Sequence, residues 1–110
     1  MTRAALPDAG ERAREVLIDW MGTRYGAVIS RLDAAMTSKL PADELASAWA
    51  QVIGAVGEYE GMGEPHVQQK GDYTVVDVPM SFRNGRMTGQ VVYDSEGRVS
   101  GLFVLMPDAA

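Results

Sequence analysis

The chain changes its hydrophobic period once, at Gly57. Before that residue apolar positions recur three and four residues apart, and after it they alternate with polar positions. The first spacing puts side chains on one face of a helix, and the second puts them on one face of a strand. The pattern predicts helices over about residues 9–21, 24–37 and 41–56, followed by strands over about 59–69, 73–83, 86–94 and 98–106.

Local signals mark the ends of these elements. Pro41 fits the first turn of the third helix, and Gly57 fits its stop. The turns KGDY, RNGR and DSEG separate the four strands, and Asn84-Gly85 is the strongest hairpin signal because both residues accept positive φ. The order of elements predicts one α+β domain, in which three N-terminal helices pack on a four-stranded antiparallel meander sheet.

The turn lengths predict which strand residues share a face of this sheet. We expect two-residue loops at Gly71-Asp72 and Asn84-Gly85, and a three-residue loop at Ser95-Glu96-Gly97. Counting outward from these loops gives an apolar face, which we expect to meet the helices. It comprises Val67, Val76, Val78, Met80, Phe82, Met87, Val91, Tyr93, Val99, Phe103 and Leu105.

The opposite face carries the one histidine of the chain. Counting from the first of these loops places His66 directly across from Asp77, within reach of a cross-strand pair. Such a pair is half of a general-base apparatus, but it is also a common surface ion pair of little energetic value. Both interpretations stay open, and His66 and Asp77 are candidate catalytic residues.

An apolar band on the same outer face predicts a contact with another protein. The band consists of Val92, Leu102, Val104 and Met106. Contiguous exposed apolar residues mark partner surfaces, and the simplest partner is a second copy of the same sheet. We therefore expect a homodimer through this face.

Composition narrows the classes of function. The net charge is −5, with 10 basic against 15 acidic residues, whereas nucleic-acid binding needs a basic face. Without cysteine there are no thiolate sites, and one histidine cannot build a typical zinc site. No stretch reaches the ~20 apolar residues of a membrane span, and the start lacks a signal-peptide core. We expect a cytoplasmic protein with no metal, cofactor, nucleic-acid or membrane partner.

A loose set of structural motifs runs through nearly the whole chain. Its segments are WMGTRYGAVISRLDAAM, LPADELASAWAQVIGAVGEY and YTVVDVPMSFRNGRMTGQVVYDSEGRVSGLFVLMP. The motif residues are Leu40, Pro41, Trp49, Gly57, Phe82, Asp94, Gly97, Gly101, Leu102, Phe103 and Pro107. In these motifs the chain resembles an uncharacterised bacterial domain family that occurs alone or ahead of serine α/β-hydrolase domains. That family looks like a small relative of the nuclear transport factor 2-like superfamily, in which helices close over a curved sheet as a cone.

The resemblance implies a pocket between the helices and the sheet. Apolar side chains would line it, and two phenols could donate hydrogen bonds to a substrate oxygen. The phenols are Tyr25 and Tyr93, and the substrate-binding candidates are Trp20, Met36, Trp49, Met80, Phe82, Met87 and Phe103. The plainer alternative is that these side chains fill the core of a small domain.

Two hypotheses of different classes follow. The first is a protein that binds a small apolar molecule, acting as a cofactor-independent cyclase or isomerase on a polyketide-like metabolite. The superfamily analogy and the seven methionines favour it, since methionine suits irregular apolar cavities. The second is a non-catalytic dimerisation or protein-interaction module that uses the outer face of the sheet. An unfilled cavity on the helix side is required by the first hypothesis alone.

Overall fold

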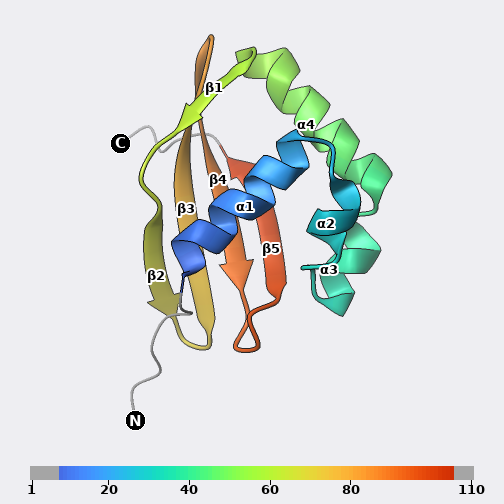
Figure 1. Ribbon diagram of the computed structural model, residues 1–110, viewed down its shortest axis with the longest axis vertical. Helices are drawn as coiled ribbons and strands as arrows, with labels where there is room; N and C mark the ends of the chain where they lie inside the picture. The colour runs from blue at the N-terminus through green and yellow to red at the C-terminus, as the bar shows by residue number, and fades with distance from the viewer. Residues whose placement is uncertain (1–7, 106–110) are drawn as a thin grey trace.

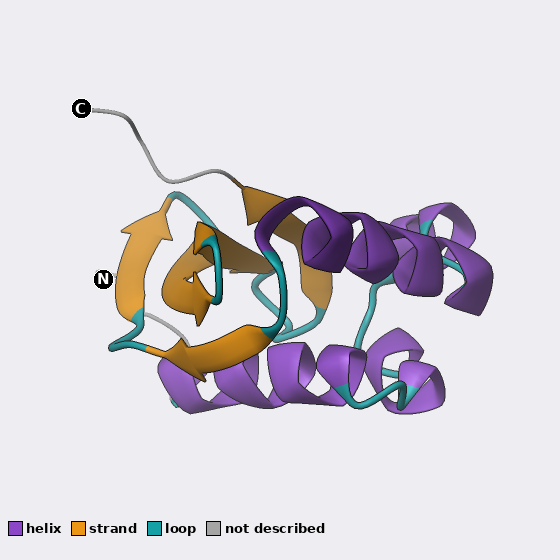
Figure 2. Ribbon diagram, turned by 90° about the horizontal axis from the view of Figure 1, so that it is seen from above, coloured by secondary structure: helices purple, strands orange, loops and turns teal. Residues whose placement is uncertain are grey.

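A curved antiparallel sheet forms one side of the molecule, and helices cover one of its faces (Figure 1 and Figure 2). The computed structural model describes residues 8–105. The helices in this part of the chain are α1 (Ala9–Met21), α2 (Tyr25–Ile29), α3 (Ala34–Lys39) and α4 (Ala42–Val56). The strands are β1 (Tyr59–Met62), β2 (His66–Lys70), β3 (Tyr73–Phe82), β4 (Gly85–Tyr93) and β5 (Val99–Leu105). The α+β class is confirmed, although each half contains one more element than expected.

β3 is the central strand of the sheet. β1 and β2 both pair with one side of β3, β4 pairs with its other side, and β5 pairs with β4 at the edge. All of these pairings are antiparallel. The single strand expected over residues 59–69 is two strands, because the chain leaves the strand conformation over residues 63–65. Pro65 ends this break and has no N–H to donate to a ladder.

The helix expected over residues 24–37 is also split in two. After α2 the backbone pairs with β5: the Val99 N–H donates to the Arg31 carbonyl, and the Asp33 N–H donates to the Val99 carbonyl, both at 2.8 Å. Asp33 then begins α3, because its carboxylate accepts the Met36 N–H at 2.8 Å. Among residues 8–105 no helix combines the length and apolarity that a membrane crossing requires.

The hairpin between β3 and β4 turns one residue earlier than expected. Its turn is Arg83-Asn84, and both N–H groups donate at 2.8 Å: Arg83 to the Glu58 carbonyl before β1, and Asn84 to the Val56 carbonyl at the end of α4. The pairing is thereby shifted by two residues, so that Met80 lies opposite Met87. Because side chains alternate with a period of two, this shift leaves each residue on its predicted face.

The pairing of β4 with β5 also differs from the prediction, and this difference moves β5 side chains to the opposite face of the sheet. The loop at Ser95-Glu96-Gly97 forms as expected, with Tyr93 opposite Val99. A β-bulge then interrupts the ladder, so that Val92 pairs with Gly101. β5 contains one extra residue at this point. The β5 residues after it therefore lie on the opposite face of the sheet from the one that the turn lengths predict.

Because of the bulge, four β5 side chains lie on the opposite face of the sheet from the predicted one. Leu102 is 5% exposed and belongs to the core, and Val104 packs against the core. Phe103 and Leu105 lie on the outer face instead, with 45% and 41% of their surface exposed. The predicted outer band is therefore wrong at Leu102 and Val104, and its Met106 lies outside the described residues.

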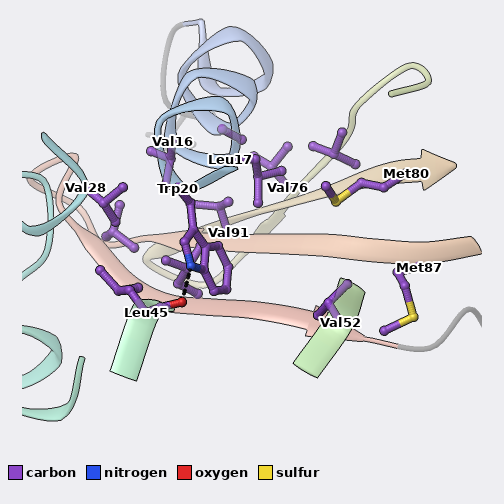
Figure 3. Close-up of a cluster of buried hydrophobic side chains, with 14 of the residues drawn as sticks. Val16, Leu17, Trp20, Val28, Leu45, Val52, Val76, Met80, Met87 and Val91 are labelled. Atoms are coloured by element: carbon purple, nitrogen blue, oxygen red, sulfur yellow. Dashed lines mark hydrogen bonds between the residues drawn. The ribbon is translucent and has the colours of Figure 1, made fainter. Parts of the chain in front are cut away.

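Side chains fill the space between the helices and the centre of the sheet (Figure 3). Leu17 of α1 packs where Gly89 leaves room in β4, since a Cβ at Gly89 would lie 2.7 Å from Leu17 Cδ1. The indole N–H of Trp20 donates to the Leu45 carbonyl at 2.7 Å, which joins α1 to α4. A buried indole without an acceptor would lose the free energy of that hydrogen bond, so this contact fixes the ring in one orientation.

Gly89→Ala is expected to destabilise the fold by about 1–3 kcal/mol, because the added methyl group would overpack Leu17 and Met80. Urea denaturation measures the free energy of unfolding. Gly61→Ala is the matched control, since Gly61 also lies in a strand and a Cβ there meets nothing within 4 Å. Equal losses in the two variants would contradict the packing account.

Candidate functional site

A hollow of about 390 Å³ lies between α4 and β5. We call it the α4–β5 groove. α4 forms one wall and β5 the other, while Trp20 and Met87 reach it from α1 and β4. The lining residues are Trp20, Leu40, Ala48, Gln51, Val52, Ala55, Met87, Leu102, Phe103, Val104 and Leu105.

Short side chains on one wall and an open strand edge on the other account for the groove. Ala48 and Ala55 of α4 line it, and an alanine side chain extends little from the helix. On the other wall the bulge turns Leu102 and Val104 toward the helices. Beyond Val99, no segment within residues 8–105 pairs with the outer edge of β5. Backbone N–H and C=O groups therefore lie beside the groove without a strand partner.

The groove is apolar and offers little acid–base chemistry. Among its described lining residues none has a titratable side chain, and Gln51 provides a side-chain amide. The indole N–H of Trp20 is already bonded to the Leu45 carbonyl. Such a lining can bind an apolar molecule and orient it with a few hydrogen bonds, but it provides no group for proton transfer.

The structure brings three of the predicted substrate-binding residues into the groove. Trp20 and Met87 are 3% and 8% exposed and form its floor, while Phe103 lines it at the edge of β5, although its ring lies on the outer face. Sequence reasoning missed the wall formed by α4. The available signal was Ala48 and Ala55, which are seven residues apart and therefore share one face of a helix.

The other predicted substrate-binding residues pack in the core or against it. Trp49 stands between Trp20 and Phe82, with ring centroids 5.8 Å from each. Met36 and Met80 are 8% and 1% exposed. These positions correspond to the plainer alternative, in which the large apolar side chains fill the interior.

His66 and Asp77 lie on the outer face of the sheet, away from the groove. Their predicted pairing is confirmed in the backbone register. His66 is exposed, however, and in the described part of the chain no hydrogen bond or ion pair joins it to Asp77. The Asp77 carboxylate instead accepts a hydrogen bond from Gln90 Nε2 at 2.9 Å. The two side chains are neighbours without forming a general-base pair.

The two predicted phenols do not line the groove. Tyr25 is half-buried on α2 and packs against the core. Tyr93 is 2% exposed and lines a separate hollow of about 210 Å³. We call this hollow the Tyr93 pocket, and its lining residues are Arg12, Glu15, Arg31, Tyr93 and Gly97.

The Tyr93 hydroxyl is buried and has no hydrogen-bond partner within residues 8–105. Burial raises the pKa of Tyr93 to about 12, although the positive charges of Arg31 and Arg12 oppose that rise. The phenol therefore stays protonated at neutral pH and has one O–H to donate.

Arg31 is held beside this hydroxyl by an ion-pair network. Its Nη1 lies 2.9 Å from Asp19 Oδ2, and Arg24 Nε donates to Asp19 Oδ1 at 2.8 Å. The hydrogen bond from Arg24 lowers the pKa of Asp19, and the charge of Arg31 acts in the same direction. Sequence reasoning missed this cluster because only tertiary packing brings Arg31 to α1.

Comparison with known proteins identifies the family. Residues 13–102 match the family described as protein of unknown function (DUF3887). The chain belongs to the DUF3887 family. The matched DUF3887 region runs from α1 to Leu102 in β5, and it includes most residues of the groove and all but Arg12 of the Tyr93 pocket. The resemblance to an uncharacterised domain family is in keeping with this result.

One solved structure shows the same fold as this DUF3887 chain. It is the NMR structure of a protein from Ruminococcus gnavus ATCC 29149, with a TM-score of 0.70 and 16% sequence identity over 94% of each chain. None of the curated proteins compared with the chain matches it. The relationship to nuclear transport factor 2-like proteins stays a prediction.

The raised pKa of Tyr93 predicts a specific loss of stability in alkali. The phenol ionises near pH 10 in the unfolded chain and near pH 12 in the folded one. The protonated phenol therefore contributes fully to the free energy of unfolding below pH 10. This contribution is lost as the pH rises toward 12, by about 2–3 kcal/mol in total. Tyr93→Phe lacks this contribution, so urea denaturation should show its stability rising relative to the wild type across that interval. Parallel pH profiles would contradict the prediction.

Proposed function

We propose that the protein binds an apolar small molecule in the α4–β5 groove. The observation that carries the proposal is the lining, which combines apolar side chains from both walls with one amide and a strand edge. Small-molecule sites are concave and mostly apolar, with a few polar groups that fix orientation. The volume of about 390 Å³ falls within the range of about 300–1,000 Å³ typical of such sites.

The resemblance to the nuclear transport factor 2-like superfamily supports this proposal, because its members hold a pocket between helices and a curved sheet. In this chain Leu17, Trp20 and Met80 fill the central space, so the hollow lies to one side, beside β5. Fold resemblance supports the presence of a pocket and does not supply a reaction.

The cyclase or isomerase activity expected from the sequence stays a prediction. Tyr25, Tyr93, His66 and Asp77 do not line the groove, and none of its described lining residues can transfer a proton. Turnover there would rest on holding a substrate in a reactive shape. We therefore limit the proposal to binding.

Fluorescence titration with N-phenyl-1-naphthylamine, a neutral apolar probe, tests the proposal. We expect saturable binding at one site in the wild type, since the probe gains fluorescence in an apolar environment. Ala48→Phe and Ala55→Phe place a ring in the groove and should each weaken binding about tenfold or more, because they remove room from one wall.

Ala50→Phe is the matched control, because Ala50 is an exposed residue of α4 that does not line the groove. Thermal unfolding of all variants shows that they are folded under the conditions of the titration. Equal probe affinity in the groove variants and in this control would overturn the proposal, as would the absence of saturable binding in the wild type.

A homodimer through the outer face is the second candidate function. The observation that favours it is an apolar patch formed by the exposed residues Tyr73, Phe103 and Leu105 with half-buried Val92, in which the Phe103 ring lies over Gly101 beside Val92. Proteins seldom leave contiguous apolar surface in water, and a face that matches itself allows a two-fold contact.

Val92→Lys should dissociate such a dimer, because it places a charge in the centre of the apolar patch without touching the groove. Sedimentation equilibrium measures the association. Val67→Lys is the control, since Val67 is an exposed apolar residue on the helix side of the sheet. A monomeric wild type would rule this candidate out.

A further inference from the structure

The Tyr93 pocket contains a polar group that the fold itself does not use. The Tyr93 hydroxyl is buried and has no hydrogen-bond partner within residues 8–105. Arg31 Nη1 is paired within the fold, because it lies 2.9 Å from Asp19 Oδ2 in an ion pair. A buried hydroxyl carries a free-energy penalty when no partner meets it, so the Tyr93 hydroxyl in this small hollow calls for an explanation.

Each of the groups proposed to bind can donate hydrogen bonds. A protonated phenol offers an O–H, and a guanidinium offers N–H groups and accepts none. Arg12 adds a second guanidinium to the lining, against one carboxylate from Glu15. The complement of a phenol beside two guanidinium groups is an oxygen-rich anion, which accepts hydrogen bonds and carries the opposite charge.

We propose that the Tyr93 pocket binds a small oxyanion, a phosphate or a carboxylate, through the Tyr93 hydroxyl and the guanidinium groups of Arg31 and Arg12. The pocket lies between α1 and the turn that joins β4 to β5, where Gly97 forms part of the lining. It shares no lining residue with the α4–β5 groove, so this site is independent of the proposed apolar ligand.

A purely structural role for Tyr93 does not account for its hydroxyl. The phenol ring supplies the buried apolar surface, and phenylalanine would supply the same ring without a buried donor. Arg31 is prepared for a ligand by its ion pair with Asp19, which holds the guanidinium in place. The geometry fits a preorganised anion site, in which the donors are fixed before the ligand arrives.

Nuclear magnetic resonance titration of the isotopically labelled protein tests the proposal. Inorganic phosphate and acetate serve as separate probes, at ionic strength held constant with sodium chloride. We expect a saturable shift of the Gly97 amide with at least one probe. The probe that saturates at the lower concentration identifies the class of the anion.

Tyr93→Phe should weaken binding of that probe about tenfold or more, the loss expected for one hydrogen bond to a charged group. Arg31→Gln should abolish the saturable shift. Arg24→Gln is the matched control, because Arg24 also binds Asp19 and its loss changes the net charge equally, but it does not line the pocket.

Retention of binding in Arg24→Gln, with loss in Tyr93→Phe and Arg31→Gln, supports the site. Equal weakening in Arg24→Gln and Arg31→Gln would overturn it, since the effect would then follow net charge alone. The absence of a saturable Gly97 shift with either probe would overturn it as well.

Discussion

One extra residue in β5 determines which of its side chains meet the helices. The bulge opposite Val92 reverses the alternation that begins at Val99, and it sends Leu102 inward and Phe103 outward. An uninterrupted ladder would instead put Leu102 in water and a phenyl ring against α4. Both the wall of the α4–β5 groove and the apolar patch on the outer face therefore depend on this single irregularity.

The dense packing under α1 explains why the hollow lies at the side of the sheet. Leu17 contacts the centre of the sheet so closely that Gly89 has no room for a methyl group. Trp20 donates a hydrogen bond to the Leu45 carbonyl, and its ring packs against Trp49 in a tilted arrangement. A core filled in this way has no space for a ligand, because protein interiors pack at the density of organic crystals. Space remains only where alanines of α4 face the edge strand.

Sequence patterns predicted much of the fold, and the failures have identifiable causes. The turn between β3 and β4 lies one residue earlier than the predicted Asn84-Gly85. Each strand residue nevertheless lies on its predicted face of the sheet, because the pairing is shifted by an even number of residues. The bulge was missed, although the small residues Ser100 and Gly101 inside a strand are a signal for such an irregularity. The break between α2 and α3 could not be foreseen, because residues 31–33 leave the helix to pair with Val99, a contact across the fold.

The candidate sites were predicted less well than the fold. Trp20 and Met87, two of the predicted substrate-binding residues, line a hollow, since each lies on an apolar face that points inward. The register also placed His66 opposite Asp77, but backbone pairing does not decide whether two side chains bond. The cluster around Tyr93 has no sequence signal, because its charged residues come from α1 and from the segment after α2.

The pairing of Val99 with residues 31–33 limits where a strand from another chain can extend the sheet at β5. Val99 uses its N–H and its carbonyl on that segment, so this end of β5 is closed to a further strand. An incoming chain could extend the sheet only over the remaining residues of β5, up to Leu105. The short stretch left open restricts edge-to-edge association, the route by which exposed strands lead to fibrous aggregates.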